Sequence, residues 1–107
     1  MSKKANSQNS INQQAQLYIS HVIGVAAEAV QVTHGNQSQV TTKVHLPLGR
    51  DMKALVARCK SAVKGRLERY TDHNGISFCV NFEGTKRVSF YQRWTDYDTI
   101  EVSVIQF

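Results

Sequence analysis

A strict alternation of apolar and polar residues in the C-terminal third of the chain constrains the fold more than any other feature. The segments ISFCVNF (76–82), KRVSFYQ (86–92) and TIEVSVIQF (99–107) each place apolar residues at every second position. Successive side chains of a strand point to opposite faces of a sheet, so each segment predicts a strand with one buried and one solvated face. The short connections between the segments predict an antiparallel three-stranded meander.

The register of this meander follows from matching the apolar faces of neighbouring strands. A two-residue turn between the first two strands would mix the faces, whereas a three-residue loop at 83–85 keeps them together. A five-residue loop at 93–97 does the same for the second hairpin. The predicted pairs are Val80–Val88, Phe78–Phe90, Phe90–Ile100 and Val88–Val102.

The N-terminal half is less regular. VTTKVHL (40–46) alternates like a strand and precedes Pro47. For residues 15–32 two interpretations stay open. One is a helix through about residue 27 with a strand at 28–34, which the AAEA run favours. The other is a hairpin, which the β-branched content and the HGNQS turn favour. Residues 1–14 are mostly Ser, Asn, Gln and Lys with a single isoleucine, which predicts a disordered polar tail.

The segment 50–69 carries the charge. It holds seven of the thirteen basic and two of the eight acidic residues, so it accounts for the whole net charge of +5. Apolar residues recur in it at helical spacing, which predicts one long basic amphipathic helix, begun by Gly49 or Asp51 and ended near Asn74-Gly75. The apolar stripe comprises Met52, Leu55, Val56, Cys59, Ala62, Val63, Leu67 and Tyr70, and Arg66 falls within it.

These elements predict an α+β fold. An antiparallel sheet, formed by the C-terminal meander and one or two N-terminal strands, carries the basic helix and an N-terminal helix on one face. The length fits a single domain at 15–107 after the polar tail. No apolar run follows the N-terminal lysines as in a signal peptide, and the two cysteines then indicate free thiols in a cytoplasmic protein.

Two groups of residues are candidates for nucleic-acid binding. Lys53, Lys60 and Lys64 line up on one flank of the predicted helix and could contact phosphates, although a solvated helix flank explains them equally well. Arg87, Tyr91 and Arg93 belong to GTKRVSFYQRW, where an aromatic ring could stack on a base beside two arginines. The alternative for this second group is a solvated sheet face on which Arg87 or Arg93 reaches Glu101.

A second set of residues predicts contacts with protein. Trp94 and Tyr97 lie in a charged loop of the kind that anchors interfaces, although a lone Trp also often covers the end of a core. Ile105 and Phe107 fall on the polar face of the last strand and predict an exposed patch or sheet edge that a second copy would cover, giving a homodimer.

Motifs for catalysis or metal binding are weak. The four histidines and two cysteines lack the spacing of a zinc site, no phosphate-binding glycine loop is present, and Asp96-x-Asp98 is typical of a turn, so we expect no cofactor and no metal. KRVSFYQ followed by TIEVSVI resembles the closing strands of small endoribonuclease toxins of the RelE type. The likeness covers about a quarter of the chain. It implies metal-independent RNA cleavage, for which His73 and Tyr91 would be the general acid–base candidates.

The sequence therefore favours a small basic binding protein without enzymatic activity, which is associated with DNA or RNA. A protein-binding or inhibitor module, such as an accessory protein of a mobile element that contacts an acidic partner surface, is the alternative. A metal-independent endoribonuclease of the RelE type is a minor alternative.

Overall fold

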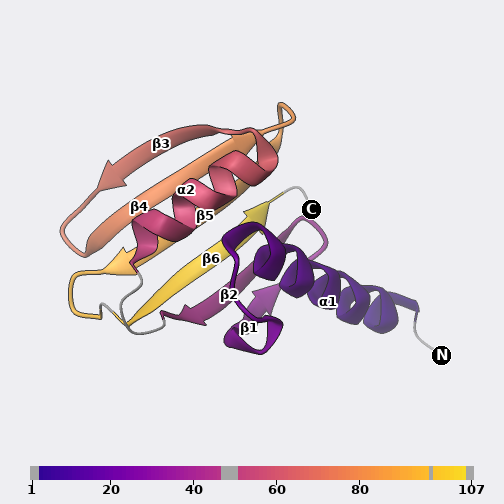
Figure 1. Ribbon diagram of the computed structural model, residues 1–107. Helices are drawn as coiled ribbons and strands as arrows, with labels where there is room; N and C mark the ends of the chain where they lie inside the picture. Colours follow the sequence, from indigo (N-terminus) through magenta and orange to yellow (C-terminus); the bar gives the residue numbers. More distant parts are fainter. Residues whose placement is uncertain (1–2, 47–50, 97, 106–107) are drawn as a thin grey trace.

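The computed structural model describes residues 3–46, 51–96 and 98–105, which form two α-helices, one short 3-10 helix and six strands (Figure 1). In chain order these are α1 (Lys3–Ile23), η1 (Ala27–Ala29), β1 (Val30–Gly35), β2 (Gln39–His45), α2 (Met52–Val63), β3 (Arg66–Thr71), β4 (Gly75–Phe82), β5 (Lys86–Arg93) and β6 (Thr99–Ile105).

The six strands form one antiparallel sheet in the order β1-β2-β6-β5-β4-β3. Both helices lie on the same face: α1 packs against β1, β2 and β6, and α2 packs against β4 and β5. We call this the covered face and the other the open face. The predicted α+β class and the helices on one face are therefore confirmed, and the sheet has more strands than the sequence indicated.

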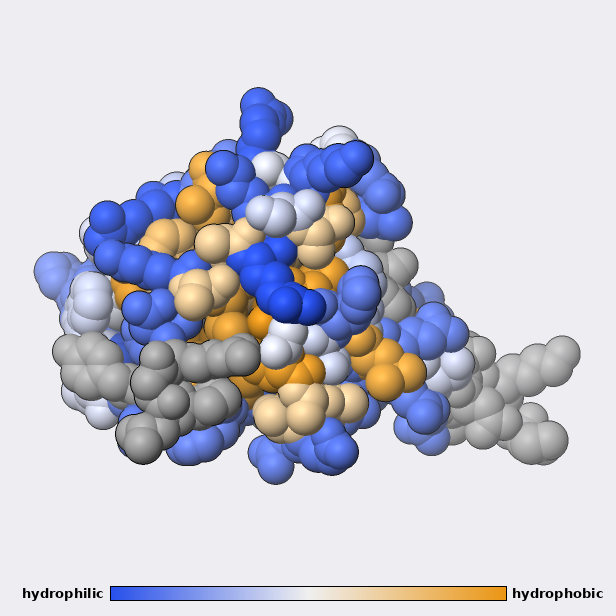
Figure 2. All heavy atoms as spheres, in the orientation of Figure 1, coloured by the Kyte–Doolittle hydropathy of each residue, from blue (hydrophilic) through white to orange (hydrophobic). Residues whose placement is uncertain are grey.

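The core lies between the covered face and the helices. It is built from alternate residues of β2, β4, β5 and β6, together with the inward stripe of each helix. The largest fully buried side chains are those of Phe90, Ile19, Ile23, Leu55 and Ile100. Seen from the helix side, apolar residues gather in the middle of the molecule with hydrophilic residues around them (Figure 2).

The predicted meander is present as β4, β5 and β6. The loop at 83–85 and the pairs Val80–Val88 and Phe78–Phe90 are confirmed. The second hairpin is shifted by two residues, so that Phe90 pairs with Val102. The shift arises because the second loop occupies 94–98, where the Asp96 carboxylate accepts hydrogen bonds from Asp98 N (3.2 Å) and Thr99 Oγ1 (2.6 Å). A shift of two preserves the faces, so the same residues of these strands face the core as predicted, whereas Leu67 and Tyr70 of the predicted apolar stripe are exposed.

The basic helix is shorter than predicted. It ends at Val63 because Lys64 adopts a left-handed conformation (φ 53°) that turns the following peptide back, so that Gly65 N donates to Lys60 O at 3.1 Å, the oxygen that also accepts from the Lys64 N–H. A Cβ on Gly65 would lie 2.5 Å from Val80 Cγ1, so this close approach requires glycine. The following residues, predicted to continue the helix, form the edge strand β3.

Of the two interpretations of residues 15–32, the structure shows the helix followed by a strand. α1 ends at Ile23 rather than near residue 27, because Gly24 has a positive φ (74°) and its N–H bonds to Ser20 O at 3.0 Å. The predicted strand at 28–34 is β1. The residues predicted as a disordered tail belong to α1 from Lys3 onward, and Ile11 packs against the core from this part.

The C-terminal strand lies inside the sheet. Because β6 is hydrogen-bonded to β2 on one side and to β5 on the other, the predicted sheet edge at Ile105 is wrong. Ile105 does lie on the open face, half-buried between Gln39 and Arg87. Phe107, the other residue of the predicted dimer patch, is outside the described residues. Neither described helix combines the length and the apolar character needed to cross a membrane.

Candidate nucleic-acid interface

A basic surface lies between α2 and β3 on the covered face. Lys53 of α2, Arg69 of β3 and Trp94, which follows β5, line one hollow in it. Lys60 lies two turns along the same flank of α2, and Leu67 precedes Arg69 by two residues on the same face of β3. We call the surface formed by these five residues the α2–β3 groove. All five side chains are exposed. The groove lies beside the helix at the outer edge of the sheet, where Figure 2 shows hydrophilic side chains interleaved with apolar ones.

Helix α2 supplies one wall because its apolar stripe fixes its rotation. Asp51 caps the first turn by accepting a hydrogen bond from Ala54 N at 2.9 Å. The buried residues Met52, Leu55, Val56 and Cys59 turn toward the sheet. Lys53 and Lys60 are seven residues apart, which is about two helical turns, so they point the same way. Since Lys53 and Arg69 line one hollow, this flank faces β3.

Strand β3 supplies the other wall. Leu67 pairs with Val80 and Arg69 with Phe78, both of which are buried on the covered face. The Arg69 guanidinium lies 6.0 Å from the centroid of the Phe78 ring, a cation–π distance that keeps the side chain over the sheet. Leu67 is 42% exposed because α2 covers β4 and β5 and leaves it uncovered.

At the N-terminal end of α2 the groove deepens into a hollow of about 300 Å³. Its lining combines apolar residues with cations: Met52, Lys53, Arg69, Ile76, Phe78 and Trp94. Trp94 is 40% exposed and is fixed by two hydrogen bonds, from its N to Asn74 O (2.8 Å) and from Nε1 to Asp72 O (3.1 Å). An indole held in this way is a rigid apolar surface beside two positive charges.

The cations of the groove form no ion pair with an acidic side chain of the described part of the chain. Among the described residues, ion pairs join Lys86 to Glu83 (2.9 Å) and Arg93 to Glu101 (3.4 Å), and neither involves Lys53, Lys60 or Arg69. Asp51 is the acid that lines the hollow, and its carboxylate is engaged by the helix N-terminus. The groove therefore has a net positive potential that favours anions.

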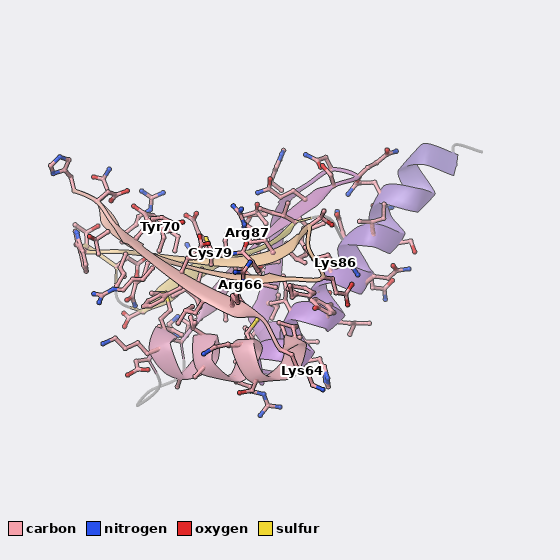
Figure 3. The ribbon with its side chains drawn as sticks, turned by 90° about the horizontal axis from the view of Figure 1, so that it is seen from above. Lys64, Arg66, Tyr70, Cys79, Lys86 and Arg87 are labelled. Atoms are coloured by element: carbon pink, nitrogen blue, oxygen red, sulfur yellow. The ribbon has the colours of Figure 1, made fainter. Side chains whose placement is uncertain are left out.

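The structure separates the two predicted nucleic-acid groups. Lys53 and Lys60 are in the α2–β3 groove, and Lys64 caps the far end of α2 beside a second hollow of about 210 Å³ that it shares with Arg66 and Glu83. Tyr91 and its arginine neighbours are instead on the open face. Tyr70, Cys79 and Arg87 lie on that face, opposite α2, in Figure 3.

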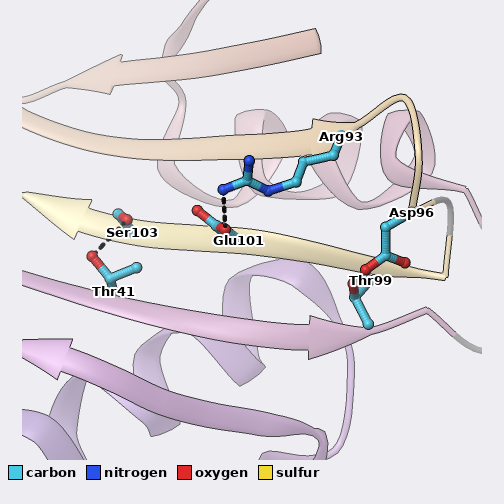
Figure 4. Close-up of polar contacts among 6 residues, drawn as sticks. All are labelled: Thr41, Arg93, Asp96, Thr99, Glu101 and Ser103. Atoms are coloured by element: carbon cyan, nitrogen blue, oxygen red, sulfur yellow. Dashed lines mark hydrogen bonds and ion pairs between the residues drawn. The ribbon is translucent and has the colours of Figure 1, made fainter. Parts of the chain in front are cut away.

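On the open face the predicted residues already have partners. Arg93 lies 5.4 Å from the Tyr91 ring centroid and pairs with Glu101, as the solvated-face alternative predicted (Figure 4). Arg87 Nε donates to Asn81 Oδ1 at 2.9 Å. In the same figure Ser103 donates to Thr41 at 3.0 Å, which shows how short polar side chains satisfy one another there. This face is the poorer candidate for phosphate binding.

The contribution of β3 is not visible in the sequence. Helical spacing continued through residue 69 would put Arg69 on the flank opposite Lys53, whereas the strand brings Arg69 to the same side. The opposite flank of α2 carries Arg58, whose guanidinium lies against Gly24 at the end of α1. Lys64-Gly65 was the available signal, since a basic residue followed by glycine is typical of a helix C-terminus.

The groups considered for catalysis are dispersed. His73 lies in the turn between β3 and β4, and Tyr91 is in the middle of the open face. Burial raises the pKa of Cys59 to about 12, and burial is also the main cause of a raised pKa at Cys79. Both thiols are therefore protonated at neutral pH. Within the described ranges no three His, Cys, Asp or Glu side chains gather as metal ligands would.

Tyr97, the remaining predicted contact residue, is outside the described part.

Comparison of the chain with known protein families, with curated proteins and with solved structures finds no match.

Proposed function

We propose that this protein binds nucleic acid through the α2–β3 groove and has no enzymatic activity of its own. The observation that supports the proposal is that Lys53 and Arg69 line one hollow with an exposed tryptophan. Lys60 follows on the same flank of α2 by helical spacing, and none of the three cations is in an ion pair within the described residues. Cations spaced along a groove can follow a phosphate backbone, and an indole beside them can stack on a base.

The groove fits a single strand better than a duplex. Trp94 is anchored by its backbone and indole N–H, so its ring is available to an unpaired base. Base-edge recognition by bidentate side chains needs Asn, Gln or Arg directed at the bases, and of these types the hollow is lined by Arg69 and Gln92. We therefore expect modest sequence preference and strong dependence on salt.

The alternative function is a protein-binding module, and the exposed Leu67 and Trp94 favour it. Apolar and aromatic side chains surrounded by basic residues would also suit an acidic partner protein. The two functions share this surface but differ in ligand, so a single titration separates them.

The test compares two triple variants that remove the same charge. In one, Lys53, Lys60 and Arg69 are replaced by Gln; in the other, Lys43, Arg87 and Arg93 on the open face are replaced by Gln. Circular dichroism establishes that both fold. Binding to single-stranded DNA, single-stranded RNA and duplex DNA is followed by the fluorescence of Trp94, the only tryptophan, at several salt concentrations.

We expect the wild-type protein to show a slope of log affinity against log salt of about −2 to −3, as three phosphate contacts imply. The groove variant should lose most of this slope and weaken all sequences alike, whereas the open-face variant should resemble wild type. A loss confined to the open-face variant would move the interface to that face. No binding to any probe at low salt would leave the protein-binding function.

A further inference from the structure

Strand β3 ends the sheet with an unprotected edge. All six of its residues are exposed, and it has no neighbour on its outer side among the described strands. Asp72 N donates to Gly75 O, so Asp72 directs its peptide groups toward β4. Peptide groups alternate in direction along an antiparallel strand, so those of Leu67, Arg69 and Thr71 point outward, away from β4.

We propose that a second copy of this chain pairs with this edge, β3 against β3 in antiparallel orientation, to form a twofold dimer with a continuous twelve-stranded sheet. The peptide groups of β3 supply hydrogen bonds to any strand, so the side chains must select the partner. In β3 they are self-complementary, because Arg66 and Glu68 share the open face on either side of Leu67.

The charges also select the register. In a twofold antiparallel pair the axis passes a residue that faces its own copy, and the flanking residues face each other. An axis at Leu67 places Leu67 against Leu67 and forms two Arg66–Glu68 ion pairs. Axes at four other residues of the strand set like charges opposite one another: Arg66 on Arg66, Glu68 on Glu68, Arg69 on Arg69, or, for an axis at Tyr70, Glu68 on Asp72. An axis at Thr71 forms no ion pair between strand residues and would pair most of the strand with the turn that follows it.

The Leu67 axis also agrees with burial and backbone direction. Leu67 is among the exposed large apolar residues of the chain, and the pairing would cover it. Its outward peptide groups would bond to those of the second Leu67, which is the arrangement of a hydrogen-bonded pair. The axis is normal to the sheet, so both α2 helices stand on the same side and the two α2–β3 grooves become one. The dimer does not depend on nucleic-acid binding.

The register is tested by oxidative cross-linking of single cysteine variants. In a hydrogen-bonded pair the Cα atoms lie about 5.5 Å apart, within the range of a disulfide. Leu67→Cys should therefore give a disulfide-linked dimer under mild oxidation. Glu68→Cys and Arg69→Cys are the matched variants, and they would cross-link efficiently only if the axis passed those residues. Wild type, with buried Cys59 and Cys79, controls for the native thiols.

Sedimentation equilibrium tests the charge pairs. Wild type should dimerise, and Arg66→Glu and Glu68→Arg should each raise the dissociation constant about tenfold or more, since each replaces two attractive pairs by two repulsive ones. The double variant Arg66→Glu/Glu68→Arg should dimerise nearly as well as wild type. A wild-type monomer at all concentrations, dimers unaffected by both single reversals, or cross-linking at 68 or 69 in preference to 67 would each overturn the proposal.

Discussion

The two halves of the sheet end differently. In the half beneath α1, the edge strand β1 is shielded: α1 packs against it, a bulge interrupts it between Val32 and His34, and Gln16 Nε2 donates to Val30 O at 2.9 Å. In the half beneath α2, the helix packs on β4 and β5, and β3 extends beyond it with every residue exposed.

The difference shows that one sheet can have a closed edge and an available one. A bulge and a covering helix are common devices that prevent edge strands from pairing with other chains. β1 has both, whereas β3 has alternating charges that permit a complementary partner. The same lack of cover leaves Leu67 and Arg69 exposed beside α2, so the basic groove and the free edge have one structural cause.

The comparison is tested most strongly by truncating one apolar residue in each half. Ile19 in α1 is fully buried, so Ile19→Ala should lower the free energy of unfolding by about 2–5 kcal/mol. Leu67→Ala at the open edge should cost less than about 1 kcal/mol. Urea denaturation at low protein concentration measures both without a contribution from association. Equal losses would mean that β3 is covered after all.

A pH series tests whether α2 excludes water from the core beneath it, although the neighbouring edge strand β3 is exposed. Burial raises the pKa of the Cys59 thiol from 9.0 to about 12. Because the unfolded chain loses this proton first, the contribution of the thiol to stability is complete below pH 9 and is lost as the pH rises toward 12. The added slope is at most about 1.4 kcal/mol per pH unit.

Cys59→Ala lacks this ionisation, so its free energy of unfolding should fall less steeply than that of wild type above pH 9. The pKa of Tyr18 is also raised, first by burial, which both proteins share, and then by the charge of the Cys59 thiolate, which Cys59→Ala removes, so the difference between the two slopes reports Cys59 together with its coupling to Tyr18. Identical slopes in the two proteins would indicate that water reaches the thiol beneath α2.

The smallest expected effect concerns the hydrogen bonds that join α1 to the edge strand β1. The partly buried Gln16 amide donates to Ala27 O and Val30 O, both at 2.9 Å, and so joins α1 to the start of β1. Gln16→Met should lower the free energy of unfolding by about 1 kcal/mol by leaving these carbonyls without the donor. Gln14→Met, at an exposed position of the same helix, is the control and should change stability by less than about 0.5 kcal/mol. Thermal unfolding of the two variants distinguishes them.

The meander could be predicted because each of its strands has one buried face. Phe78, Val80, Val88 and Phe90 recur with a period of two, and this period fixes which residues pair. β3 could not be identified in the same way. Both of its faces are exposed, so no apolar period marks it, and Leu67 and Tyr70 happen to continue the helical spacing from Val63.

The amino-acid sequence alone was enough to predict the α+β class, the strands with a one-sided core and the concentration of positive charge in residues 50–69. These properties depend on local periodicity and composition, which a single chain displays directly. Where that charge lies depends on contacts between distant parts of the chain. Whether Arg69 joins Lys53 or faces away depends on a chain reversal at Gly65 and on the packing of α2 over β4 and β5, and such long-range contacts leave no periodic signal in the residues that they bring together.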